Sequence, residues 1–119
     1  MNNAGRQESR HQAAAADLEA RVAEVTGLLR ELANEKRLLT LCLLIETGEM
    51  RVSDLADRIG LSQSAASQHL ARLRDENLVT FRRDSQTLWY RIADPRVEDL
   101  MAQLHRIFCP DEPTASPPR

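Results

Sequence analysis

The segment from Ser62 to Asn77 carries side chains that are suited to reading DNA. Its sequence, SQSAASQHLARLRDEN, places Ala66, Leu70 and Leu73 on one apolar helical stripe. The other face carries mostly Ser and Gln, where a solvated helix usually carries Glu and Lys. Ser and Gln both donate and accept hydrogen bonds and can pair with base edges in a major groove. Taken alone, the segment also fits an ordinary polar surface helix.

A pair of arginines, Arg82 and Arg83, lies in a segment where apolar residues begin to alternate with polar ones, with the period of two that is typical of strands. Residues 78–83 and 87–92 are predicted to be strands joined by residues 84–86. The side chains expected on the core side are those of Leu88, Tyr90 and Ile92. A hairpin tip would deliver the two arginines to phosphates or to a minor groove. A solubilising hairpin tip is the alternative.

Two short helices joined by a tight turn must position these side chains. Ser53 is expected to cap a helix of sequence DLADRI that stops at Gly60, and Ser62 to cap the next helix, which ends near Asn77. Two capped helices joined by a turn containing glycine are typical of a helix-turn-helix.

The flanking helices carry apolar faces of their own. From about Ala13 to Ala33 the apolar residues are spaced 4, 3, 4 and 3, which predicts a helix with a heptad-like seam; they are Leu18, Val22, Val25, Leu29 and Leu32. Asn34 is expected to cap a second helix that ends near Thr47. Asp94 and Pro95 begin the last helix, whose broad apolar face comprises Val97, Leu100, Met101, Leu104, Ile107 and Phe108. We expect the first and last helices to pair two subunits, with packing of the first helix onto its own domain as the alternative.

The composition sets broad limits on the class of protein. The 119 residues suffice for one domain, with a disordered arm over residues 1–12, a folded part over 13–109 and a disordered tail over 110–119. No apolar run is long enough to span a bilayer, and two cysteines without a secretion signal indicate a reducing, cytoplasmic location. The net charge is −2, yet residues 62–92 hold five arginines against three acidic residues. This asymmetry favours nucleic-acid binding weakly.

The whole pattern resembles the ArsR family of winged-helix repressors. The segments NEKRLLTLCLLIE, LSQSAASQHLARLRDENLV and TLWYRI carry the likeness, which covers residues 18–109. It implies a mainly α-helical winged helix-turn-helix with a two-stranded β-wing, which dimerises through its first and last helices. It also implies a homodimer that binds double-stranded operator DNA in one state and releases it in another, without a cofactor and without enzymatic activity. The DNA-contacting residues implied are Ser62, Gln63, Ser64, Ser67, Gln68, His69 and Arg72 on the recognition helix, with Arg82, Arg83 and Gln86 in the wing.

The inducer must be inferred from other residues, because the family responds to several. Thiolate metal sensors of the family carry cysteines where this chain reads SDLADR, and the zinc sensors carry Asp/His pairs where this chain has Asp94 and a solitary His105. Neither metal site is assembled, since such metals need three or four ligands. Cys42 and Cys109 resemble instead the pair of the persulfide- and sulfide-responsive branch (BigR, SqrR and HlyU-type regulators), in which a disulfide or polysulfide bridge joins two cysteines. A metal- or peroxide-responsive regulator remains the alternative, as does Cys42 as a simple core residue.

Two other classes of function would use parts of the same pattern. A thiol enzyme needs a nucleophile, a base and an orienting group around a pocket, and the chain has no Cys-x-x-Cys motif. A winged-helix protein that binds other proteins rather than DNA would have the same pattern of elements, and only a failure to bind any duplex would identify it.

Overall fold

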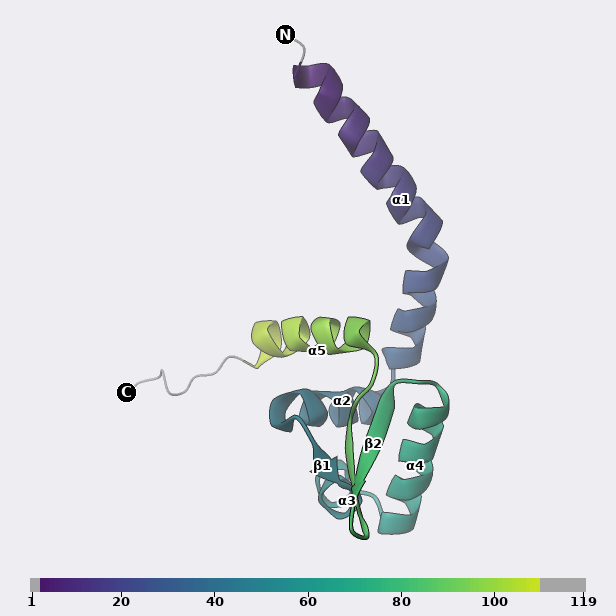
Figure 1. Ribbon diagram of the computed structural model, residues 1–119, viewed down its shortest axis with the longest axis vertical. Helices are drawn as coiled ribbons and strands as arrows, with labels where there is room; N and C mark the ends of the chain where they lie inside the picture. Colours follow the sequence, from purple (N-terminus) through teal and green to yellow (C-terminus); the bar gives the residue numbers. More distant parts are fainter. Residues whose placement is uncertain (1–2, 110–119) are drawn as a thin grey trace, which may run out of the picture. The chain divides into compact units, whose positions relative to one another are not determined.

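The computed structural model describes residues 3–109, with side chains from residue 16 onward, and divides the chain into two units, Met1–Asn34 and Glu35–Arg119. The first unit is the helix α1 (Asn3–Leu32). The second contains α2 (Glu35–Thr47), β1 (Met50–Arg51), α3 (Val52–Ile59), α4 (Gln63–Asp75), β2 (Val79–Asp84), β3 (Thr87–Ile92) and α5 (Pro95–Phe108) (Figure 1). The mainly α-helical winged helix-turn-helix predicted from the sequence is confirmed.

The helix α1 begins earlier than the sequence pattern predicted. It starts at Asn3, whereas the apolar seam indicated a start near Ala13 and an arm over residues 1–12. The start was predicted from the apolar seam alone. Residues 3–12 have no apolar stripe, but they contain Gln, Glu and Arg, which favour a helix. The predicted tail, residues 110–119, lies outside the described part of the chain. Four apolar side chains form an exposed row along α1; they are Leu18, Val22, Val25 and Leu29.

The core of the second unit lies between the helices and the inner face of a small sheet. Its fully buried side chains come from every helix of the unit and from the start of β2, and include Leu41, Leu44, Leu55, Leu70, Leu73, Val79 and Met101. The helix α4 contributes Ala66, Leu70 and Leu73, at the spacing predicted from its apolar stripe. This packing leaves the opposite face of α4 in solvent.

Helix ends follow local capping chemistry, with one difference from the prediction. Ser62 accepts a hydrogen bond from the Ala65 amide at 3.1 Å and begins α4, as predicted. Gly60 ends α3 in the left-handed conformation at φ 81°, which glycine adopts without a steric penalty. The prediction that Ser53 caps α3 is wrong. Arg51 holds the cap position without a side-chain cap bond, and Ser53 lies inside the helix.

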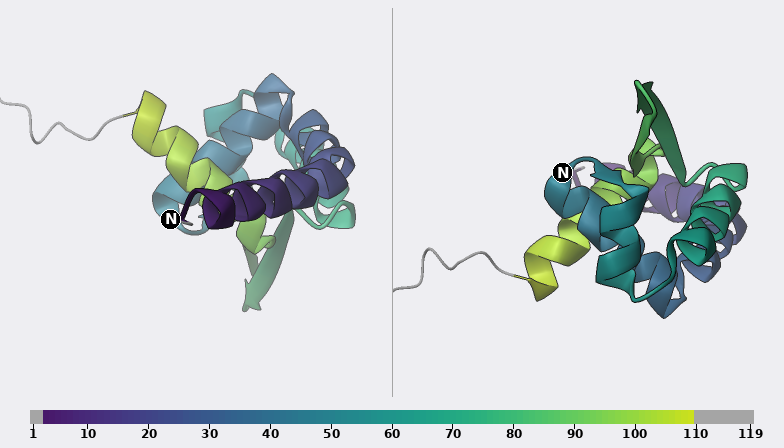
Figure 2. Two further views of the ribbon diagram at one scale, coloured as in Figure 1. Left: turned by 90° about the horizontal axis from the view of Figure 1, so that it is seen from above. Right: turned by 90° about the horizontal axis from the view of Figure 1, so that it is seen from below.

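The sheet has three strands in the order β1-β3-β2, all antiparallel. The hairpin of β2 and β3 pairs Asp84 with Thr87 across a two-residue turn, in which Ser85 has φ 58°. The sequence did not predict β1, which adds Met50 opposite Tyr90 and ties the hairpin to the start of α3. The hairpin extends away from the helices as a wing (Figure 2).

Candidate nucleic-acid interface and thiol pocket

The polar side chains of α4 lie on one exposed surface, as expected for a recognition helix. Gln63, Ser64, Ser67 and Gln68 are all exposed, while Ala66, Leu70 and Leu73 hold the other face in the core. Ser62 and Arg72 are exposed as well. Amides and hydroxyls on the first two turns can therefore approach base edges without unfolding any part of the core.

His69, which was also predicted to contact DNA, has different surroundings from the other polar residues of α4. Its side chain is half-buried, and its Nε2 lies 3.0 Å from the Thr40 hydroxyl on α2. Burial lowers the pKa of the imidazole, and the positive charges of Arg37, Arg72 and Lys36 lower it further. The ring is thus held neutral against α2 and supports α4 there, while its predicted contact with DNA stays a prediction.

A polar groove runs between the start of α4 and the tip of the wing. Its volume is about 340 Å³, and its lining comprises Arg51, Val52, Ser53, Gln63, Ser67, Gln86, Thr87 and Leu88. The groove joins three residues of the predicted DNA-contacting set, Gln63, Ser67 and Gln86, on one surface. Arg51, Ser53 and Thr87 were not among the predicted DNA-contacting residues; Arg51 belongs to β1, a two-residue strand that is too short to show a period.

The two wing arginines differ in their surroundings. Arg82 makes a bidentate ion pair with Glu49, at 2.8 Å and 3.0 Å, and its guanidinium also lies over the Trp89 ring. Arg83 is on the opposite face of β2, exposed near the tip. The pair with Arg82 lowers the pKa of Glu49. The positive charge of Arg82 is therefore balanced locally, while Arg83 presents its guanidinium to solvent.

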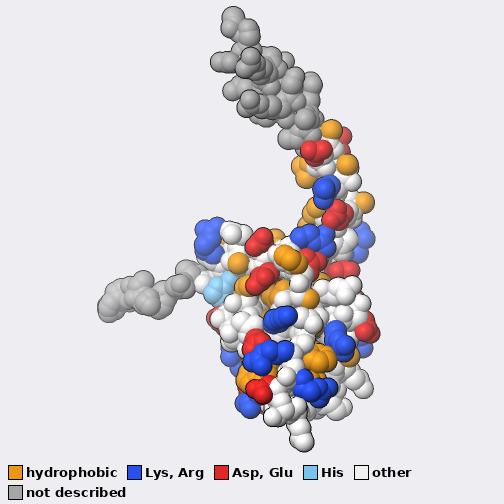
Figure 3. Space-filling model, in the orientation of Figure 1, with side chains coloured by type: hydrophobic (Ala, Val, Ile, Leu, Met, Phe, Trp, Pro, Cys, Tyr) orange, Lys and Arg blue, Asp and Glu red, His pale blue; other side chains and the backbone are white. Residues whose placement is uncertain are grey.

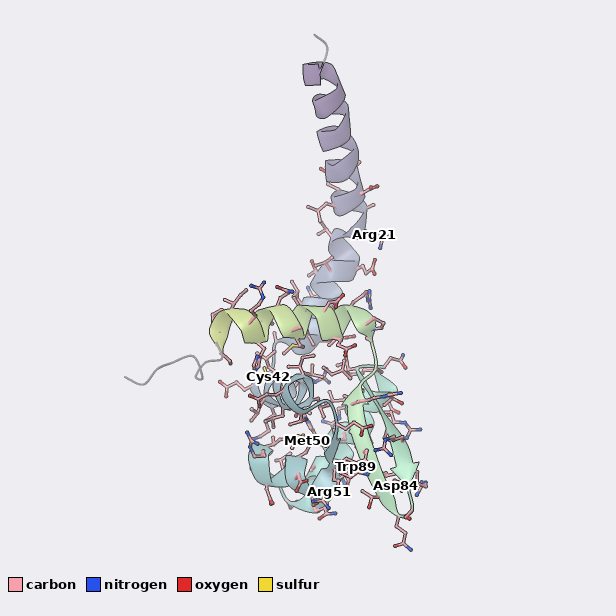
Figure 4. All side chains as sticks on the ribbon, turned by 60° about the vertical axis from the view of Figure 1, so that its left-hand side comes forward. Arg21, Cys42, Met50, Arg51, Asp84 and Trp89 are labelled. Atoms are coloured by element: carbon pink, nitrogen blue, oxygen red, sulfur yellow. The ribbon has the colours of Figure 1, made fainter. Side chains whose placement is uncertain are left out.

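Aromatic contacts fix the wing to the end of α4. The Arg74 guanidinium lies 4.5 Å from the centre of the Phe81 ring, and Phe81 packs against Tyr90 with ring centres 5.3 Å apart. On the outer face of the sheet, Arg51 stacks over Trp89, and Figure 4 shows the two side by side. Basic side chains lie over the hairpin in Figure 3, and those of β2 and β3 are all arginines. The recognition helix and the wing thus form one continuous surface rich in cations.

The two cysteines line one small pocket between α2 and α5. The pocket has a volume of about 200 Å³ and is lined by Leu38, Cys42, Leu104, His105, Phe108 and Cys109. Cys42 is half-buried, Cys109 is exposed, and both thiols are free. In Figure 4 Cys42 lies directly beneath α5. The structure therefore brings together the two residues that the sequence singled out, although they are far apart in the chain.

The surroundings of the two thiols are unequal. Burial raises the pKa of the Cys42 thiol, and the negative charges of Cys109 and Glu46 raise it further. Glu46 also lies 3.3 Å from His105 Nε2, one turn before Cys109 on α5. Cys42 therefore holds its proton more firmly than an ordinary cysteine, and Cys109 is the thiol that reagents can reach.

Within residues 16–109, whose side chains are described, no group of three or more His, Cys, Asp or Glu is arranged to hold a metal ion. None of the described helices is long and apolar enough to cross a membrane.

The fold and the exposed polar helix define a DNA-binding protein of the winged helix-turn-helix class. Residues 34–80 match the family described as "Bacterial regulatory protein, arsR family". The transcriptional activator HlyU of Vibrio cholerae is 42% identical over 93 residues, which cover 78% of this chain and 85% of that protein. The biofilm growth-associated repressor of Xylella fastidiosa (strain 9a5c) is 36% identical over 115 residues, covering 97% of this chain and 100% of the relative. The chain belongs to the ArsR family, and it is a transcriptional regulator rather than an enzyme.

Solved structures agree with this assignment. The crystal structure of the transcriptional regulator HlyU from Vibrio vulnificus CMCP6 matches with a TM-score of 0.73 and 41% identity, over 80% of this chain and 98% of that chain. The transcriptional repressor BigR from Xylella fastidiosa matches with a TM-score of 0.69 and 36% identity, over 82% of this chain and 98% of that chain. The resemblance to ArsR-family winged-helix proteins stated from the sequence is confirmed.

Proposed function

We propose that the protein is a homodimeric repressor that releases operator DNA when reactive sulfur species join Cys42 to Cys109. The DNA surface comprises the recognition helix and the wing, with Ser62, Gln63, Ser64, Ser67, Gln68, Arg72, Arg82, Arg83 and Gln86. Two recognition helices related by a twofold axis would enter successive major grooves about one helical turn apart, on an imperfect palindrome.

The observation that carries the sensing proposal is the shared pocket. Cys42 and Cys109 line one apolar space with free thiols, and the negative charge of one raises the pKa of the other. An apolar lining disfavours charged reagents inside the pocket and favours a neutral bridge. The similarity to relatives named HlyU and biofilm growth-associated repressor supports placing the protein in the sulfur-responsive branch of the family.

The chemistry balances with a hydropersulfide as the oxidant. The exposed Cys109 thiolate attacks the terminal sulfur of RSSH. The sulfur–sulfur bond of RSSH breaks, RSH leaves, and Cys109 becomes a persulfide. The Cys42 thiolate then attacks the inner sulfur of that persulfide, which forms the bridge and releases H₂S. The two thiols lose two electrons, and the outer sulfur of the persulfide accepts them. Because the pKa of Cys42 is raised, the closing step should accelerate as the pH rises toward that pKa.

A bridge would connect two elements that support the recognition helix and the predicted dimer interface. It links the middle of α2 to the end of α5 and closes a long loop, which stabilises the folded chain by about 4 kcal/mol when the geometry is unstrained. A coupling of only about 1–3 kcal/mol between bridge and DNA is enough for a useful switch.

The test is to replace each cysteine and measure operator binding before and after treatment with a hydropersulfide. Cys42→Ser and Cys109→Ser should bind operator DNA as the wild type does when reduced, and both should lose the release. The chain has two cysteines in all, so the double variant leaves no thiol to react. Normal release by the double variant would disprove the switch.

Mass spectrometry of the same samples distinguishes the inducers. A bridge formed by hydropersulfide, with a loss of two hydrogens or a gain of sulfur, supports sulfur sensing. A bridge closed by peroxide alone would make the protein a peroxide sensor instead. Release of the reduced wild type by stoichiometric Zn²⁺ or arsenite would point to a metal site. Failure of the reduced protein to bind any duplex at low salt would exclude DNA as the partner.

A further inference from the structure

A buried hydroxyl on α2 holds the recognition helix. Thr40 is fully buried, and its Oγ1 donates a hydrogen bond to the Lys36 carbonyl at 2.7 Å. The same oxygen lies 3.0 Å from His69 Nε2 on α4. A hydroxyl has one proton, and that proton is used on Lys36, so the Thr40 oxygen accepts from an Nε2–H of His69.

The helix α2 thus presents different faces to the thiol pocket and to the recognition helix. Cys42 lies on the face that contacts α5, together with Leu38. Thr40, two positions earlier, projects roughly 160° away around the helix axis and contacts α4. An Arg37–Glu76 ion pair, at 2.6 Å, lies on this same side and joins α2 to the end of α4.

A second threonine on α2 provides a natural comparison. Thr47 donates to the Leu43 carbonyl at 2.8 Å, which is the same bond within the helix that Thr40 makes to Lys36. Thr47 is exposed and belongs to the last turn of α2. The two hydroxyls therefore make the same bond within α2 and differ in their burial and in the contact with His69.

We propose that the Thr40–His69 hydrogen bond transmits the state of the thiol pocket to the recognition helix, a role that rests on the proposed thiol switch. Both residues act in this proposal as positioning residues, and neither lines the thiol pocket. Because Thr40 is fully buried, its oxygen cannot exchange this bond for one with solvent. A shift of α2 on bridging must therefore move α4 with it or break the bond, and either result alters the recognition helix.

The experiment compares Thr40→Val with Thr47→Val. The quantity measured is the ratio of operator Kd between the bridged and the reduced protein, and coupling of the usual size gives a ratio of about 5 to 150 for the wild type. We expect Thr47→Val to keep the wild-type ratio, Thr40→Val to bring it toward one, and Thr40→Ser, which retains a hydroxyl, to restore it. A role in stability alone would change both affinities together and leave the ratio unchanged.

A measurement on the wild type keeps the proposal testable if Thr40→Val does not fold. The ¹⁵N shifts of the His69 ring, observed in the reduced and in the bridged protein, should show a neutral Nε2–H ring whose shift changes on bridging. Identical His69 shifts in both states, or a wild-type ratio in folded Thr40→Val, would overturn the proposal. Loss of release in the wild type itself would overturn the thiol switch instead, so the two failures are distinguishable.

Discussion

At the scale of single residues, the wing arginines are unequal and Glu49 is the reason. Its carboxylate pairs with both nitrogens of one edge of Arg82, at 2.8 Å and 3.0 Å. A phosphate that binds Arg82 must compete with this carboxylate. On the proposed DNA surface, Glu49 should therefore weaken the contribution of Arg82 to DNA affinity, and Arg83 should contribute without this competition.

Glu49→Gln should strengthen operator binding, because it releases one positive charge in the wing. We expect affinity to rise several-fold at low salt and the slope of log K against log salt to steepen by about 0.9, the value for one more phosphate contact. Protonation should act in the same direction. Since Arg82 lowers the pKa of Glu49, the ion pair persists as the pH falls and is lost only below the range of an ordinary glutamate. Titrations of DNA binding against salt and pH measure both effects.

Three variants provide controls for this prediction. Glu98→Gln makes the same charge change in the first turn of α5, outside the wing, and should have little effect. Arg83→Ala should weaken binding to all sequences and flatten the salt slope by about 1, whereas Gln68→Ala should relax base preference. An unchanged affinity and slope in Glu49→Gln would show that Arg82 does not contact phosphate.

The sequence predicted the exposure of the polar side chains on α4, but it did not predict contacts between residues that are far apart in the chain. The exposed Gln63 and Gln68 follow from the apolar stripe of α4, which any helix with that period must bury. The contact of His69 with Thr40 was not predicted, because the two residues are 29 positions apart and on different helices. The pairing of Arg82 with Glu49, 33 residues apart, escaped prediction for the same reason.

At the scale of elements, two serines that look alike in the sequence have different roles. Ser62 caps α4 with a hydrogen bond to the Ala65 amide, while Ser53 lies within α3, whose cap position is Arg51. Ser62→Ala should lower the free energy of unfolding by about 1 kcal/mol, because it leaves an amide at the start of α4 without its partner. Urea denaturation of the reduced protein measures this loss.

Ser53→Ala is the matched control. It should change the free energy of unfolding by less than about 0.5 kcal/mol, the usual effect of a substitution away from any cap or core contact. Equal losses in the two variants would mean that Ser53 makes a stabilising contact comparable to the cap of α4.

Most helices and strands could be predicted from the sequence. The predicted and observed elements differ where a strand is very short, where its pairing joins distant parts of the chain, or where a helix has no apolar stripe. Periods of 3.6 and 2 predicted α4 and the hairpin of β2 and β3 within a residue or two. A two-residue strand such as β1 has no period, and its pairing of Met50 with Tyr90 joins distant parts of the chain. The early start of α1 reflects helix propensity without an apolar stripe, which a search for periodicity does not detect.

At the scale of the whole molecule, DNA reading by one domain would be weak, and a second copy would supply the other half-site. The exposed row on α1, formed by Leu18, Val22, Val25 and Leu29, has the 4, 3, 4 spacing of a helical interface. Ile107 and Phe108 at the end of α5 are also exposed, at 60% and 75%. Burial of such rows between two subunits would remove apolar surface from water.

Val22→Glu should therefore shift the protein from dimer to monomer, because a carboxylate in an apolar interface must lose its hydration without a partner. Ala20→Glu is the matched control, since Ala20 projects from the opposite side of α1 and is also exposed. Sedimentation velocity should show a lighter species for Val22→Glu alone. Binding to a two-half-site operator should fall at least tenfold, with little change for a single half-site, because only the linked second contact is lost. A Val22→Glu protein that remains dimeric would exclude α1 from the interface and leave α5 as the surface to test next.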